Sequence, residues 1–134
     1  MNTVTTVAPS SSDALLRFAM RLDATLTGAA GLGIAAFAYP LATLTGLTST
    51  QLFVAGAAFV LYGVVVYRLA GLSTVRRAGG WVIGANIACT VAAAIVVIDS
   101  LAPLTAAGVA LTLAAGAYTA AFAVLQYLGV RRLA

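Results

Sequence analysis

Four long apolar stretches, nearly free of charge, constrain this chain more than any other feature. They cover about residues 22–44, 51–70, 80–98 and 104–128. An α-helix rises about 1.5 Å per residue, so roughly 20 residues cross the ~30 Å hydrocarbon core of a bilayer. A transmembrane barrel would instead need segments of about 10 residues that alternate apolar and polar side chains, and none is present. The sequence therefore predicts an all-α membrane protein, a four-helix transmembrane bundle.

Composition also indicates a lipid environment. Apolar residues make up 63% of the 134 residues and charged residues only 7%, far from the values of soluble domains. Residues 1–12 are small, polar and uncharged, so we expect a flexible tail there and the transmembrane domain over residues 13–134. Within that domain, residues 13–21 are amphipathic, and we expect them to lie at the membrane interface.

The arginines predict how the helices are oriented. The seven cations of the chain are Arg17, Arg21, Arg68, Arg76, Arg77, Arg131 and Arg132. They precede the first stretch, flank the loop between the second and third, or follow the fourth, while the other two loops hold no cation. By the positive-inside rule, both termini and the middle loop are cytoplasmic. Because the bias toward Arg, Ala and Gly is typical of high-GC bacterial coding, we expect a multi-pass protein of a bacterial inner membrane.

Two prolines predict irregular helix ends. Pro40 lies near the end of the first apolar stretch, so we expect a kink or an early end there. Pro103 can occupy the first turn of the fourth helix, where its missing N–H costs nothing. The pair Arg17 and Arg21, with "AFA" at 36–38, also imitates a signal peptide, but we expect the first stretch to remain as a transmembrane helix.

A faint internal repeat has an offset of about 60 residues. It aligns "PLATLT" (40–45) with "SLAPLT" (100–105), and Tyr67 with Tyr127. A genuine repeat would relate two hairpins of the same topology by an axis along the membrane normal. The alternative is chance similarity in an Ala-rich chain.

The residue types exclude most chemistry. The chain has no His, Glu or Lys, one Cys and two Met, which cannot assemble a metal cage or ligate haem. Aspartates are the only carboxylates that could activate a nucleophile. We therefore expect no enzymatic activity and no cofactor. The arginines lie at the ends of apolar segments rather than among aromatics on a polar face, so the lipid bilayer, and not nucleic acid, is the expected partner.

Small residues recur every four positions in the third and fourth stretches. The two ladders are Gly80, Gly84, Ala88 and Ala92, and Gly108, Thr112, Gly116 and Ala120. Small faces let helix backbones approach closely, which matters in lipid because no hydrophobic force drives helices together. We expect both ladders to pack within the chain, a seam between copies being the alternative.

Polar side chains within the apolar stretches are costly and therefore informative. They are Asp23, Tyr62, Tyr67, Asn86 and Gln126, and all fall in the cytoplasmic half of the predicted bundle. Together they predict a small polar pocket in which Asp23 could titrate. The alternatives are an interfacial ion pair between Asp23 and a nearby arginine, and simple interhelical hydrogen bonds for Asn86 and Gln126.

Two soft motifs carry a resemblance to known families. With "LRFAMRLDATLTGAAGLG" (16–33) and "LATLTGL" (41–47), the first half resembles small actinobacterial four-helix integral membrane proteins of the DoxX-like kind. "LRF" (16–18) is also similar to the opening of GtrA-like proteins, which are four-helix proteins implicated in polyprenyl-linked sugar translocation. Neither resemblance implies a catalytic residue.

These features predict a non-enzymatic accessory or structural subunit that packs on itself or on a larger membrane complex. The alternative is a small carrier or flippase-like transporter with the polar pocket in its cytoplasmic half. A carrier needs polar groups spread across the membrane, whereas the outer half is nearly all Ala, Val, Leu and Thr. That distribution favours the subunit.

Overall fold

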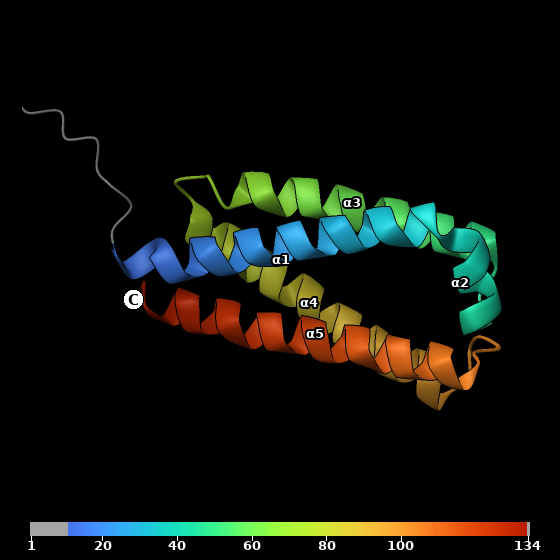
Figure 1. Ribbon diagram of the computed structural model, residues 1–134. Helices are drawn as coiled ribbons and strands as arrows, with labels where there is room; N and C mark the ends of the chain where they lie inside the picture. Colours follow the sequence, from blue (N-terminus) through green and yellow to red (C-terminus); the bar gives the residue numbers. More distant parts are fainter. Residues whose placement is uncertain (1–10, 134) are drawn as a thin grey trace, which may run out of the picture.

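The computed structural model describes residues 11–133, and this part of the chain forms five helices and no strand (Figure 1). The helices are α1 (Ser11–Ala36), α2 (Ala38–Thr45), α3 (Ser49–Leu69), α4 (Val75–Ile98) and α5 (Ala106–Arg131). Each of α3, α4 and α5 is long and apolar enough to cross a membrane, and α1 with α2 qualifies as one bent span. The described chain is therefore all-helical with three or four candidate membrane spans.

The first apolar stretch is two helices rather than one. The chain bends by 90° between α1 and α2, at Phe37. Pro40 explains the break, because in a continuous helix its ring would clash with the carbonyl of Ala36, whereas the first turn of a new helix tolerates it. The kink expected near Pro40 is thus confirmed.

The start of α1 differs from the sequence prediction. Residues 1–10 of the expected tail lie outside the described residues, but Ser11 and Ser12 belong to α1. Residues 13–21 continue into the apolar stretch without a break as part of α1, and their place at the membrane interface stays a prediction. Asp13 lies in the first turn of α1, where a helix dipole favours an anion.

Threonines cap two of the other helices. The Thr48 hydroxyl accepts the N–H of Gln51 at 3.1 Å, and the Thr48 N–H donates to Gln51 Oε1 at 2.9 Å, which is a capping box at the start of α3. Thr105 accepts the N–H of Gly108 at 3.0 Å and caps α5. Because α5 begins after this cap, Pro103 lies in the preceding loop, and its expected place in the first turn was wrong.

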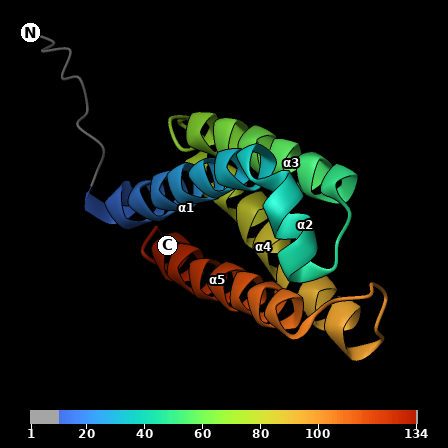
Figure 2. The ribbon, with the colours of Figure 1, turned by 45° about the vertical axis from the view of Figure 1, so that its right-hand side comes forward.

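The long helices form two hairpins, α1 with α3 and α4 with α5, and α1 also packs on α5 (Figures 1 and 2). At one end of the bundle α2 crosses from the first hairpin to the second, where the carbonyl of Thr45 accepts the N–H of Thr105 at 3.0 Å. The hairpins coincide with the halves of the sequence repeat. Residues 99–105, however, contain no helical counterpart of α2.

Glycines bring the backbones of α1 and α3 into contact. A Cβ added to Gly31 would lie 2.5 Å from the carbonyl oxygen of Gly56, and one added to Gly56 would lie 2.6 Å from that of Gly31. A Cβ added to Gly63 would likewise lie 2.6 Å from the carbonyl oxygen of Ala24. In lipid, close approach and the dispersion contact it allows hold helices together. These glycines form the seam of the first hairpin and were not among the packing residues predicted from the sequence.

The small residues of α5 face neighbouring helices. Gly108 is buried against the backbone of Thr45. Gly116 is buried next to α4, where a Cβ added to it would lie 3.2 Å from the Cβ of Ala93. Half-buried Thr112 donates to the carbonyl of Gly108 at 2.8 Å. This ladder therefore packs within the chain.

The small residues of α4 face outward. A Cβ added to Gly80 or Gly84 would have nothing within 4 Å, and Ala88 and Ala92 are exposed. Packing within the chain was therefore a wrong expectation for this ladder. The reason is helical geometry: Gly84 is two positions from Asn86, about 200° around the helix, and Asn86 faces the interior.

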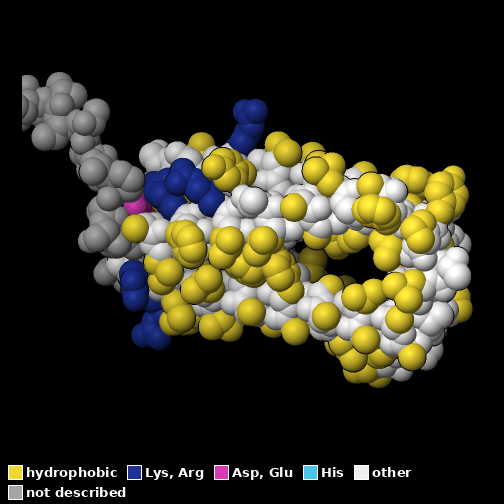
Figure 3. All heavy atoms as spheres, in the orientation of Figure 1, with side chains coloured by type: hydrophobic (Ala, Val, Ile, Leu, Met, Phe, Trp, Pro, Cys, Tyr) yellow, Lys and Arg dark blue, Asp and Glu magenta, His cyan; other side chains and the backbone are white. Residues whose placement is uncertain are grey.

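Arginines and apolar side chains divide the surface (Figure 3). The arginines lie near the start of α1 and α4 and the end of α3 and α5. Antiparallel packing brings these helix ends together, so the arginines visible in Figure 3 gather at the end of the bundle opposite α2. Much of the remaining surface in that view consists of hydrophobic side chains, as expected for helices in contact with lipid.

Candidate functional site

Asp23 lies near the middle of α1, and its side chain is completely buried. Among residues 11–133 it has no arginine partner: Arg17 pairs with Asp13 at 3.1 Å, and Arg21 lies over the ring of Tyr67, 5.8 Å from its centroid. The interfacial ion pair considered for Asp23 was therefore wrong. Arg21 is only two residues away, and side chains two apart in a helix do not face each other.

One oxygen of Asp23 connects the four long helices. Oδ2 accepts hydrogen bonds from the Tyr62 hydroxyl of α3 at 2.8 Å, Nδ2 of Asn86 in α4 at 3.0 Å, and Nε2 of Gln126 in α5 at 2.9 Å. Asn86 Nδ2 also donates to Gln126 Oε1 at 2.9 Å. Both amide side chains are buried. The structure thus brings together four of the five polar residues that the sequence singled out.

The other carboxylate oxygen of Asp23 accepts hydrogen bonds from two hydroxyl groups that were not predicted from the sequence. Oδ1 accepts from Thr27 at 3.0 Å and from Tyr118 at 3.1 Å, and these two hydroxyls lie 2.9 Å apart. Tyr118 also reaches the backbone carbonyl of Asp23 at 3.1 Å. Spacing could have revealed both residues: Thr27 is one turn after Asp23, and Tyr118 is two turns before Gln126.

Tyr67 is not part of this cluster. It is 52% exposed and lies on the outside of α3 beneath Arg21. Five positions separate it from Tyr62, which rotates it well away from the inner face of the helix. The pocket predicted from the sequence therefore loses Tyr67 and gains Thr27 and Tyr118. We call the resulting set the Asp23 cluster: Asp23, Thr27, Tyr62, Asn86, Tyr118 and Gln126.

A second group of polar contacts, made by Thr90, lies beside the Asp23 cluster on the side of α2. Thr90, one turn beyond Asn86, lies 2.6 Å from the hydroxyl of Thr119 and donates to the carbonyl of Gly116 at 3.1 Å. The same Thr90 hydroxyl, which has a single proton to share, also lies 3.0 Å from the carbonyl oxygen of Asn86. These bonds join α4 to α5 beside the cluster.

On the arginine side, the Asp23 cluster adjoins an apolar core. Leu16 and Met20 of α1 are completely buried there with Val66, Val75 and Val82. Asp23 lies one turn beyond Met20, so its carboxylate is separated from the arginine end by packed hydrocarbon. Water is excluded from this side of the carboxylate.

The chemistry of the cluster is that of an acceptor surrounded by donors. The five side chains that bond to the carboxylate are three hydroxyls and two amides, all of which direct N–H or O–H groups toward it. That arrangement stabilises negative charge in a medium of low polarity. A cation site needs oxygen ligands pointing inward, and the described part of the chain has no group of three His, Cys, Asp or Glu side chains that could hold a metal.

The resemblance to DoxX-like and GtrA-like proteins remains a prediction from short motifs. Searches against models of protein families, curated proteins and solved structures find no match for this chain.

Proposed function

We propose that the protein is a non-enzymatic accessory or structural subunit of a bacterial inner membrane, with both termini in the cytoplasm. The observation that carries the proposal is the outward-facing ladder of α4: Gly80, Gly84, Ala88 and Ala92. It presents a row of small residues, flanked by the exposed side chains of Trp81, Ile87 and Val91, while the polar groups of the Asp23 cluster are bonded to one another inside the bundle.

The seam between α1 and α3 supports this role for the ladder. There, Gly31 and Gly56 allow two helices to touch through their backbones, and in lipid such close packing is one of the forces that associate helices. The ladder of α4 offers the same kind of surface but has no helix against it within residues 11–133. A helix of a second copy, or of a larger membrane complex, fits such a face.

Association can be tested in membranes with Ala88→Cys in a Cys89→Ser background, which places the single cysteine on the exposed ladder of α4. Oxidative cross-linking at this cysteine detects a second copy on the ladder face, and co-purification in mild detergent detects a different partner. We expect Gly84→Leu to abolish the association. Ala57→Leu, at an exposed position of α3, is the matched control and should leave it unchanged. A monomer without partners, or equal losses in both variants, would contradict the proposal.

The orientation is tested separately. In a Cys89→Ser background, a cysteine at Ser73, in the loop between α3 and α4, should resist labelling by an impermeant maleimide added from the periplasm. This loop lies beside Arg76 and Arg77, so the positive-inside rule places it in the cytoplasm. Labelling from the periplasm would reverse the proposed topology.

A carrier is the second candidate, and two observations favour it. The buried carboxylate of Asp23 has no cationic partner in the described chain, and an intramembrane acid of this kind often relays protons. Figure 3 also shows an opening between the two hairpins toward the α2 end. Proteoliposomes loaded with a pH-sensitive dye and given a pH gradient would reveal proton movement that Asp23→Asn abolishes. No difference from the variant, or from empty vesicles, would exclude a proton-coupled carrier.

A further inference from the structure

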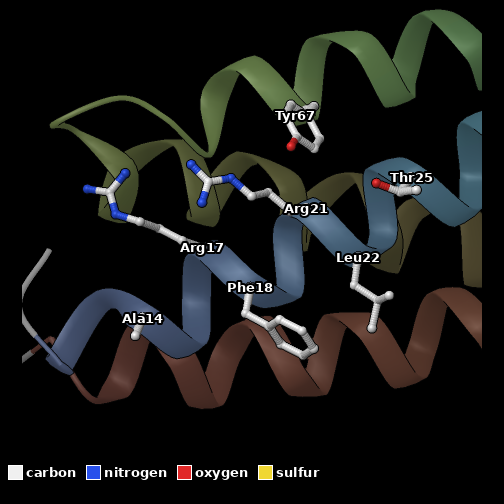
Figure 4. Close-up of a pocket in the computed structure, with 7 residues that line it drawn as sticks. All are labelled: Ala14, Arg17, Phe18, Arg21, Leu22, Thr25 and Tyr67. Atoms are coloured by element: carbon white, nitrogen blue, oxygen red, sulfur yellow. The ribbon is translucent and has the colours of Figure 1, made fainter.

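Two adjoining grooves run along the outer surface of the hairpin formed by α1 and α3. The first, about 480 Å³, lies near the arginine end and includes Arg17, Arg21 and Tyr67 (Figure 4). The second, about 430 Å³, continues along the hairpin, shares Thr25 and Tyr67 with the first, and also includes Arg68. Together they form one surface furrow, basic at one end and apolar along the rest.

The basic end has three arginines, and they differ in whether their N–H groups already have polar partners within residues 11–133. Arg17 donates to the carbonyls of Ala70 and Leu72 at 2.7 and 2.9 Å and pairs with Asp13, so it fastens the loop after α3. Arg21 and Arg68 are exposed, and within residues 11–133 neither makes a hydrogen bond or an ion pair. Their guanidinium groups are free to bind an anion with paired N–H donors.

The apolar part of the furrow has the length of one membrane leaflet. Its floor includes Gly28 and Gly63, where α1 and α3 meet and no side chains fill the space, and Leu32 and Val60 are among its walls. Eleven positions of α1 separate Arg21 from Leu32, a rise of about 16 Å. This is roughly half of the ~30 Å hydrocarbon core of a bilayer.

We propose that this furrow is a binding site for one anionic phospholipid of the leaflet on the arginine side. Its phosphate binds Arg21 and Arg68, and an acyl chain lies over Gly28 and Gly63. Tyr67 stands at the junction, where a lipid changes from polar headgroup to hydrocarbon, as is typical of interfacial tyrosines. The site follows from the surface of the first hairpin and does not depend on the ladder of α4 or on the Asp23 cluster.

The test is native mass spectrometry of the full chain released from nanodiscs that contain equal amounts of phosphatidylglycerol and phosphatidylcholine. We expect the wild type to retain one phosphatidylglycerol in preference to phosphatidylcholine. Each arginine that contacts the phosphate of the bound lipid should contribute about a fivefold preference for anionic lipid, so Arg21→Gln combined with Arg68→Gln should lower the preference by about 25-fold. Free glycerol phosphate at the same concentration should not displace the lipid, because it lacks the acyl chain.

The chain offers a matched control for each half of the site. Arg131 lies over Tyr127 at 5.9 Å, much as Arg21 lies over Tyr67, but borders neither groove. Arg131→Gln should therefore keep the preference. Equal losses in both sets of arginine variants, equal retention of the two lipids, or displacement by glycerol phosphate would overturn the proposal.

For the acyl chain, the informative variant is Ala29→Trp. Ala29 is exposed and lines the second groove, whereas Ala30 is exposed but does not. A bulky side chain at position 29 should fill the furrow and prevent retention of the lipid, while Ala30→Trp should have no effect. If the Ala29→Trp protein retained the lipid, the acyl chain would not lie in the furrow.

Discussion

Replacing Asp23 tests whether the Asp23 cluster holds the four long helices together. In Asp23→Ala both carboxylate oxygens disappear from a site that water does not reach. Two donor atoms then have no partner in the structure, the hydroxyl of Tyr62 and Nε2 of Gln126, and Asn86 Nδ2 loses one of its two acceptors. The hydroxyls of Thr27 and Tyr118 still bond to each other, and Asn86 still bonds to Gln126 Oε1.

The two orphaned donors set the magnitude. An unsatisfied buried donor costs about 1–3 kcal/mol in water-soluble proteins, and hydrogen bonds between membrane helices are worth about 0.6–1.7 kcal/mol. We therefore expect Asp23→Ala to lower the free energy of unfolding by about 2–4 kcal/mol. Loss of the buried charge opposes this change, because burying a charge is itself costly.

Asp23→Asn separates the shape of the side chain from its charge. With the amide oxygen in the place of Oδ2, Asn can still accept from Tyr62, Asn86 and Gln126. Its NH₂ group then replaces Oδ1 and faces the two hydroxyls there, which can rotate and accept. We expect its free energy of unfolding to stay within about 1 kcal/mol of the wild type.

The assay is unfolding of the purified protein in mixed micelles by increasing mole fractions of SDS, followed by far-ultraviolet circular dichroism. The order of stability should be wild type close to Asp23→Asn, with Asp23→Ala well below both. If Asp23→Asn were as damaging as Asp23→Ala, the charge and not the hydrogen-bond geometry would hold the cluster. If Asp23→Ala were harmless, the cluster would not stabilise the bundle at all.

The same unfolding assay tests two further contrasts. Tyr62→Phe should cost about 1 kcal/mol because it removes a hydrogen bond to a carboxylate, whereas Tyr67→Phe should be neutral since that hydroxyl lies outside the cluster; equal effects would argue against the assignment. Gly63→Ala should cost about 1–3 kcal/mol because the new Cβ meets the Ala24 carbonyl at 2.6 Å. Gly33→Ala, with nothing within 4 Å, should instead stabilise by up to about 1 kcal/mol, and a loss there would show that the helix surface at Gly33 is not open.

The sequence by itself determined the solvent of this protein and most of its helices. Long uncharged runs can satisfy their backbone groups in lipid only as helices or closed barrels, and the absence of alternation left helices. Pro40 marked the break between α1 and α2 because a missing N–H and a steric clash are local effects. Asp23, Asn86 and Gln126 were recognisable because polar groups in an apolar stretch need partners.

Only the tertiary structure decided which face of each helix points inward. A span that is apolar on all sides has no amphipathic signal, so the ladder of α4 could be assigned to either face. Asn86 and Thr90 mark its inner face, but this becomes clear only when their partners on α1 and α5 are known. Likewise, Asp23 bonds to amides and hydroxyls rather than to arginine because helix packing, through the glycine contacts of α1 and α3, sets which side chains meet at the centre.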